Sequence, residues 1–209
     1  MIEGIKDRLV MREWVNFQQV HNEGGPASCQ KDMDTFFIMR GSQFAPWSQE
    51  LMESWYDDLA QAEGDGRNLL AEKYAWMMEH TDPEAFQNVR RLLKQPTEEA
   101  LALIEEIVPL ELKGMEGYRK KYPYLAQGNR SFYAVEDERY ATSFETYLRG
   151  ELHTYSERTL RLYQQMAEEL DRQGSSVALV VMDSMVKAYG YSSLEEAERQ
   201  CRLRAEGRV

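Results

Sequence analysis

Three clusters of charged and amide side chains stand near the starts of expected helices, and their residue types suit the binding of an anion. Each cluster contains one arginine, Arg40, Arg67 or Arg149, whose planar guanidinium can donate two parallel hydrogen bonds to a carboxylate or phosphate. Helix N-termini would add backbone N–H donors. If the three segments converge, they form a polar pocket for a small anionic ligand. Its candidate residues are Arg40, Gln43, Arg67, Asn68, Glu72, Lys73, Glu145, Tyr147, Arg149 and Glu151.

The same residues allow plainer interpretations. Glu145 and Arg149 are four residues apart and His153 continues the row, so they also fit an ion-paired, solvated helix face or a buried structural network. A further alternative is an enzyme in which Glu72, Glu145 or Glu151 acts as general acid or base while arginines hold an anionic substrate. Because no catalytic motif is present, we expect a binding or regulatory module for a small anionic ligand or a protein partner.

Metal and cofactor chemistry has little support in the sequence. None of the three histidines has a glutamate three positions earlier, and neither HExxH, paired CxxC nor an EF-hand loop occurs. The DMD run at residues 32–34 is better explained as a helix cap than as a cation site. The run EGDGRN at residues 63–68 lacks the GK[ST] of a phosphate-binding loop. We therefore expect no metal site and no cofactor.

Nucleophilic catalysis is equally weakly indicated. Cys29 lies in a glycine- and proline-rich stretch eight residues after His21, but a reactive thiolate needs a lowered pKa and a nearby base, which spacing alone does not provide. No GxSxG elbow of a serine hydrolase is present. We expect Cys29 to be an incidental thiol.

Composition limits the partners and the compartment. The net charge of −11 argues against nucleic acid and anionic membrane surfaces. No run of 18 apolar residues exists, so no membrane span is expected. The first residues, MIEGIKDRLVMREW, are charged throughout and lack the apolar core of a signal peptide. With only Cys29 and Cys201, far apart, a cytoplasmic protein with reduced thiols is the simplest expectation.

Helical periodicity runs through nearly the whole chain. Apolar residues recur at steps of three, four and seven, and no linker or low-complexity segment divides the pattern. We therefore expect an all-α protein: residues 1–209 form a single irregular multi-helix domain of about eight to ten helices. The expected helices cover residues 5–21, 32–40, 47–62, 66–80, 83–94, 97–114, 142–174, 177–190 and 193–207, with a short one around Tyr118.

Several boundaries follow from local signals. Thr142 with Glu145 forms a possible capping box and Gly174 a stop, so residues 142–174 are expected to be the longest helix. Asp82 followed by proline predicts another start, and Pro109 should end or kink its helix. The apolar run at 177–190 predicts a buried helix, with a strand as the alternative.

Five segments resemble a family of uncharacterised bacterial proteins known only as a domain of unknown function. They are N-x-GG-x-A-x-CQ (22–30), TF-x-IMR-x-SQF-x-x-W (35–47), GRNLL-x-EKYA-x-MM (66–78), TSFETYLRGEL-x-TYS (142–156) and YGY-x-SLEEAE (189–198). The resemblance extends from about residue 10 to 198 and implies one domain in a bacterial, cytosolic setting. It implies no reaction, ligand or catalytic residue. Pro26 departs from the residue expected there, commonly arginine, which removes a possible cationic contact.

Overall fold

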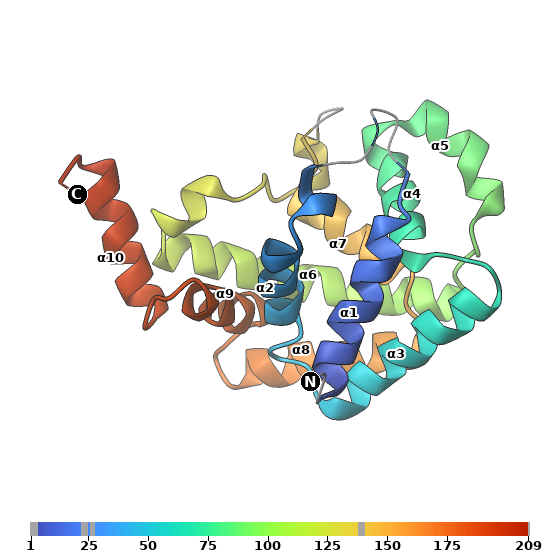
Figure 1. The fold of residues 1–209 in the computed structure, drawn as a ribbon, viewed down its shortest axis with the longest axis horizontal. Coiled ribbons are helices and arrows are strands. Elements are labelled where there is room, and N and C mark those ends of the chain that lie inside the picture. Colours follow the sequence, from blue (N-terminus) through green and yellow to red (C-terminus); the bar gives the residue numbers. More distant parts are fainter. Residues whose placement is uncertain (1–3, 22–24, 26–27, 138–140, 209) are drawn as a thin grey trace.

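The computed structural model describes residues 4–208 except 22–24, 26–27 and 138–140. Within these residues the chain forms ten α-helices, four short 3-10 helices and no β-strand, which confirms the all-α prediction. None of the described helices combines the length and the apolar character that crossing a membrane requires. The α-helices are α1 Ile5–Gln18, α2 Met33–Gln43, α3 Gln49–Gly64, α4 Leu69–Thr81, α5 Pro83–Val89, α6 Glu98–Lys121, α7 Phe144–Leu152, α8 Glu157–Arg172, α9 Val177–Ala188 and α10 Leu194–Ala205 (Figure 1).

Short polar side chains begin nine of these helices, because each accepts a backbone N–H that the first turn leaves unpaired. The capping residues are Asp32, Ser48, Asn68, Asp82, Thr97, Ser143, Ser156, Ser176 and Ser193. The cap predicted within the DMD run is Asp32, while Asp34 lies in the first turn of α2, and the predicted cap at Asp82 is confirmed. The cap predicted at Thr142 lies one residue later, at Ser143.

The predicted 142–174 helix is wrong in its middle, because α7 ends at Leu152 and α8 begins at Glu157. The break is held by Asp58 on α3, whose carboxylate accepts the backbone N–H of Ser156 at 3.0 Å and the hydroxyl of Thr159 at 2.6 Å. Asp58 thus stabilises a second helix start that the periodicity concealed. The predicted stop is confirmed, since Gly174 has a φ of 71° just after α8.

The longest helix is instead α6, with 24 residues. It does not end at Pro109, and Tyr118 belongs to this helix rather than to a separate short one. An internal proline costs about 3 kcal/mol and removes one backbone donor, but α6 packs along its length against α7, α8 and α9. Those packing contacts offset the cost of the proline, so α6 continues past Pro109.

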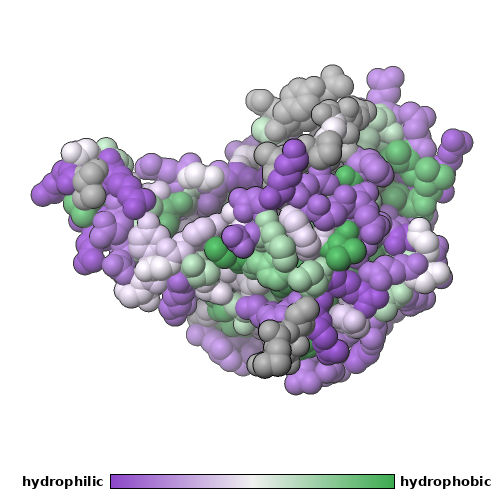
Figure 2. Space-filling view, viewed as in Figure 1, coloured by the Kyte–Doolittle hydropathy of each residue, from purple (hydrophilic) through white to green (hydrophobic). Residues whose placement is uncertain are grey.

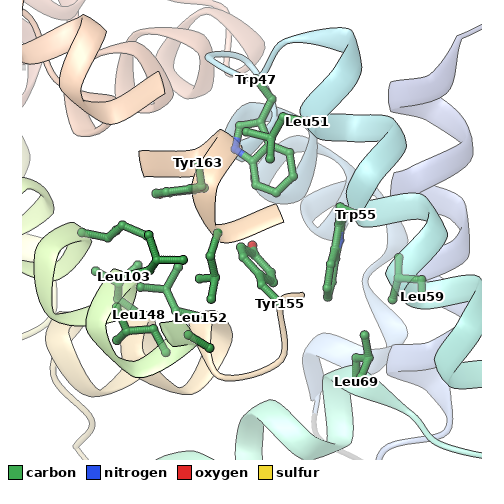
Figure 3. Packing of buried hydrophobic residues seen from close by; sticks show 14 of the residues in the cluster. Trp47, Leu51, Trp55, Leu59, Leu69, Leu103, Leu148, Leu152, Tyr155 and Tyr163 are labelled. Atoms are coloured by element: carbon green, nitrogen blue, oxygen red, sulfur yellow. The ribbon is translucent and has the colours of Figure 1, made fainter. Parts of the chain in front are cut away.

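Two hydrophobic clusters share α6. The larger contains residues from α1, α3, α7, α8 and the first half of α6, such as Leu51, Trp55 and Ile104 (Figure 3). The smaller joins the second half of α6 to α9 and α10 through Tyr118, Val186 and other buried residues. In Figure 1, α10 forms an arm at the left of the molecule. The continuity of α6 therefore connects the main body to this arm.

Helix α9 confirms the helix prediction for residues 177–190 but not the prediction that the helix is buried. Only Val177, Ala178 and Val186 are buried, while Ala188 is exposed and the other apolar side chains of α9 are partly exposed. The reason is its position, since α9 packs against α2 and α6 but is not enclosed. Figure 2 shows apolar side chains gathered over the neighbouring α2 as well, where Met33 and Met39 are exposed.

Gly150 lies where α7 packs against α4. A Cβ atom there would be 2.7 Å from Met77 Cγ and 2.8 Å from the backbone oxygen of Lys73. We expect Gly150→Ala to lower the free energy of unfolding by about 1–3 kcal/mol through overpacking, despite alanine's higher helix propensity. Urea denaturation tests this against Gly117→Ala on α6, where no atom lies within 4 Å of the added Cβ. A destabilisation of equal size in both variants would contradict the close approach.

Candidate functional site

A buried ion-pair cluster centres on Arg40 of α2. Its guanidinium forms an ion pair with Glu13 of α1 through two nitrogens, and Nη2 donates to Oε1 of Glu13 at 2.6 Å. Arg40 also donates a hydrogen bond to Gln43. Nη1 donates to Glu151 Oε1 at 2.8 Å. Glu13 is 0% exposed, and its remaining partner is the indole N–H of Trp55 at 2.7 Å. Four helices thus meet through one charged network: α1, α2, α3 and α7.

Glu151 of α7 links this network to α4. Lys73 Nζ donates to Glu151 Oε2 at 2.7 Å and lies 3.6 Å from the ring centre of Tyr147, and the hydroxyl of Tyr155 donates to Glu151 Oε1 at 3.0 Å. Burial by itself raises the pKa of Glu151, but the charges of Arg40 and Lys73 lower that pKa well below its ordinary value. Glu151 is therefore a stable carboxylate with fully engaged oxygens, which makes it a poor proton acceptor.

A cleft of about 340 Å³ opens beside this network, at the junction of the two hydrophobic clusters. Its walls come from α2, α6, α7, α8, α9 and the segment around Arg130, and most of the lining is apolar. Four predicted site residues lie in its lining: Arg40, Gln43, Tyr147 and Glu151. The apolar lining includes Met39, Met115, Phe144, Leu148, Leu152, Val177, Ala178, Val181, Met182 and Met185.

Three aromatic rings pack together at the inner wall of the cleft, and Trp47 meets both tyrosine rings in edge contacts. Trp47 lies 6.0 Å from Tyr155 and 5.8 Å from Tyr163, and the two tyrosine rings are 6.2 Å apart, measured between ring centres. Figure 3 shows the three side chains grouped beside Leu152. All three are less than 9% exposed. They form a rigid aromatic surface inside the cleft rather than on the outside of the molecule.

Glu111 of α6 is the second carboxylate of the cleft. Its side chain is buried, Tyr163 donates to its Oε1 at 2.8 Å, and no cation pairs with it among the described residues. Burial raises the pKa of Glu111 to about 7, against a smaller lowering by the Tyr163 hydrogen bond. Glu111 therefore titrates around neutral pH, whereas Glu151 stays ionised there.

Sequence reasoning missed both Glu111 and Glu13, although a signal was present. Glu111 stands in the apolar stripe of α6 formed by Ile104, Ile107 and Met115. Glu13 likewise interrupts the apolar face of α1. A carboxylate at a core position of an amphipathic helix is expected to be paired or to have a raised pKa.

The second predicted cluster lies outside the lining of this cleft. Arg67 pairs with Glu72 through two hydrogen bonds of 2.6 and 2.7 Å, and it lines two other cavities, of about 350 and 570 Å³. Asn68 caps α4 and donates to the backbone oxygen of Asn16 at 2.8 Å. Asn68 therefore fastens the start of α4 to the end of α1.

The third predicted cluster is also paired internally. Arg149 donates to Glu145 at 2.9 Å and to Glu105 at 2.6 Å, which confirms the pair spaced four residues apart. Glu145 and Arg149 line a separate cavity of about 500 Å³ with His153 and Trp76. Each of the three candidate arginines is thus held by carboxylates of its own, and only Arg40 borders the cleft.

Arg130 is a cleft residue that was not predicted. It is exposed at the cleft, donates to the backbone oxygen of Thr142 at 3.3 Å, and lies 5.1 Å from the ring centre of Tyr147. It makes no ion pair with a described carboxylate.

Pro26 and the side chain of Cys29 lie outside the described residues. In the described part of the chain, no group of three or more His, Cys, Asp or Glu side chains is arranged to hold a metal ion.

Comparison with known proteins gives one match. A family model described as "Protein of unknown function (DUF4125)" matches residues 3–199, which includes every residue of the cleft and of the ion-pair network. No curated protein matches the chain. No solved structure matches it either.

Proposed function

We propose that this protein, which belongs to the DUF4125 family of proteins of unknown function, binds a small organic molecule with an apolar body in the cleft between α2, α6, α7, α8 and α9. The observation that carries the proposal is the combination of a volume of about 340 Å³ with mainly apolar walls and a few convergent polar groups. Small-molecule sites have this composition and are of this size.

The ion-pair network serves this proposal as a rigid polar wall. Arg40 donates four hydrogen bonds to two carboxylates and an amide oxygen, and Lys73 donates to Glu151. An anionic ligand would have to displace these partners to reach either cation. The anionic ligand predicted from the sequence therefore stays a prediction, and Arg130 is the cleft cation best placed to meet it.

Filling the cleft should weaken ligand binding. We expect Val181→Trp to weaken binding of a neutral apolar dye, Nile red, by at least about tenfold, or 1.4 kcal/mol, because Val181 lines the cleft. The matched control is Val180→Trp, which places the same ring on the same helix at a residue outside that lining. Fluorescence titration measures both affinities. Equal affinities in the two variants, or no binding by the unchanged protein, would refute a ligand site here.

Glu111 favours a second candidate function, an enzyme with Glu111 as general acid or base. A carboxyl group with a pKa of about 7 exchanges its proton readily at neutral pH, and it borders a cleft large enough for a substrate. Glu72, Glu145 and Glu151, the carboxylates considered from the sequence, are each held by a cation instead. Loss of turnover in Glu111→Gln with retained ligand binding would support this candidate.

Three further expectations accompany the proposal. A cytoplasmic location is supported by the family resemblance and by the two widely separated cysteines. The absence of a nucleic-acid partner is supported by the net charge of −11. A protein partner stays an alternative, supported by the half-exposed apolar side chains of α2 and α9 (Figure 2).

A further inference from the structure

We infer that the ligand of this cleft carries a protonated amine, which pairs with Glu111 beside the aromatic surface of Trp47, Tyr155 and Tyr163. The inference rests on the proposed function and deepens it by naming the polar group of the ligand. Its basis is geometric. A buried carboxyl group without a cationic partner borders an open cleft, and three aromatic rings line the same wall.

The carboxyl group of Glu111 has one unused oxygen. Tyr163 donates to Oε1, while Oε2 has no hydrogen bond among the described residues. A buried carboxylate normally gains a cation or several donors, because burying an unpaired charge is costly. Every other described carboxylate of the cleft and its network has such a partner: Glu13 has Arg40, and Glu151 has Arg40 and Lys73. Glu111 is therefore the position where a ligand can supply the missing positive charge.

The aromatic surface also favours binding of an ammonium group. The faces of tryptophan and tyrosine rings attract ammonium groups through their quadrupoles, by about 2 kcal/mol or more in desolvated sites. Trp47, Tyr155 and Tyr163 line the cleft together with Glu111. An ammonium on an apolar body would thus find a carboxylate, aromatic rings and methionine or valine side chains in one cavity.

None of the described charged groups around Glu111 supplies it with a positive partner. Tyr163 faces it from α8, and Tyr155 and the ionised Glu151 lie further along the cleft. Asp171 of α8 shares with Glu111 a second cavity of about 10 Å³ and is paired with Lys113 at 2.6 Å. The α9 side chains that line the cleft are all apolar. Of the two cleft cations, Arg40 is neutralised by its carboxylates, and Arg130 is exposed to solvent.

Binding of the amine should release a proton. Around neutral pH the protonated Glu111 would give up its proton to solvent, and the resulting carboxylate would pair with the ammonium, so that charge and protons balance. The preference for an amine should therefore grow as pH rises from 6 to 8. The pKa of Glu111, raised to about 7 by burial, lies in the middle of this window.

The test compares n-octylamine with 1-octanol, which differ only in the polar end group. Isothermal calorimetry at pH 8 should show the amine binding at least about tenfold more tightly than the alcohol to the unchanged protein. In Glu111→Gln this preference should disappear, while the affinity for the alcohol changes less than about twofold. The control, Glu106→Gln, alters the net charge equally at an exposed position of the same helix and should keep the preference.

The outcomes separate this inference from the proposed function. Equal binding of amine and alcohol, or a preference that survives in Glu111→Gln or is lost in Glu106→Gln, overturns amine recognition but leaves the apolar ligand site intact. Failure of the alcohol and the amine alike to bind overturns the proposed function and this inference with it. A preference that does not increase between pH 6 and pH 8 also overturns the pairing with Glu111.

Discussion

Replacing Arg40 with leucine is expected to lower the free energy of unfolding by about 3–5 kcal/mol, the scale for breaking a buried ion pair. The reason is the burial of Glu13, which is 0% exposed and would keep only the indole N–H of Trp55 as a partner. Glu151 would keep Lys73 and Tyr155 and should contribute less to the loss. Chemical denaturation at pH 7 measures the change.

The matched control for this substitution is Arg149→Leu. Arg149 also holds two carboxylates, but the Glu105 side chain is 64% exposed and Glu145 also accepts the backbone N–H of Ala134 at 3.0 Å. Water and the remaining donor compensate for the lost arginine, so we expect a loss of about 1 kcal/mol. Equal losses in the two variants would show that the Arg40 network contributes no more to the free energy of unfolding than the ion pairs of Arg149.

A double variant tests whether the loss comes from the unpaired carboxylate of Glu13. Adding Glu13→Met to Arg40→Leu removes the buried carboxylate and replaces it with an apolar side chain. We expect this second change to restore at least half of the lost stability. If the double variant is instead less stable than Arg40→Leu alone, the loss arises from packing rather than from an unpaired Glu13.

Glu111→Gln is expected to stabilise the protein at alkaline pH, by up to about 3 kcal/mol at pH 8. Burial raises the pKa of Glu111 from 4.5 to about 7, and each unit of pKa difference corresponds to about 1.4 kcal/mol. Between these values the folded protein holds a proton that the unfolded chain has lost, so stability falls as pH rises. The neutral glutamine does not carry this penalty and can still accept the Tyr163 hydroxyl.

Denaturation at pH 5 and pH 8 tests the sign as well as the size. At pH 5 the folded protein carries Glu111 protonated, so the variant and the unchanged protein should differ by less than about 1 kcal/mol. Glu106→Gln, at an exposed position of the same helix, should leave the pH dependence of stability as it was. A Glu111→Gln variant whose stability relative to the unchanged protein is independent of pH would refute the buried, unpaired state of this carboxyl group.

The sequence by itself determined the helical class and most helix starts. A cap joins a side chain to a backbone N–H two or three residues later, as Asn68 and Asp82 do, so the signal lies within a few adjacent letters. The stop at Gly174 is local for the same reason. The resemblance to a family of unknown function was likewise visible in the sequence and is confirmed by the match to residues 3–199.

The tertiary structure alone decided where the long 142–174 pattern breaks and whether α6 continues through Pro109. The break depends on Asp58, which is 98 residues from Ser156 in the chain. The continuity of α6 depends on contacts with three other helices. Periodicity describes one helix face at a time, so it does not record an acceptor that another helix supplies.

The tertiary structure also decided which polar residues form a site. Of the ten candidates, the three arginines resembled one another in sequence, yet each meets different carboxylates. Arg40 reaches Glu13 across 27 residues and Glu151 across 111, and Lys73 reaches Glu151 across 78. Glu111 entered the site because the packing of α8 and α9 on α6 left a cleft at that point. Whether a charged side chain is paired, neutral or open to a ligand depends on such distant neighbours, because burial and charge act through space and not along the chain.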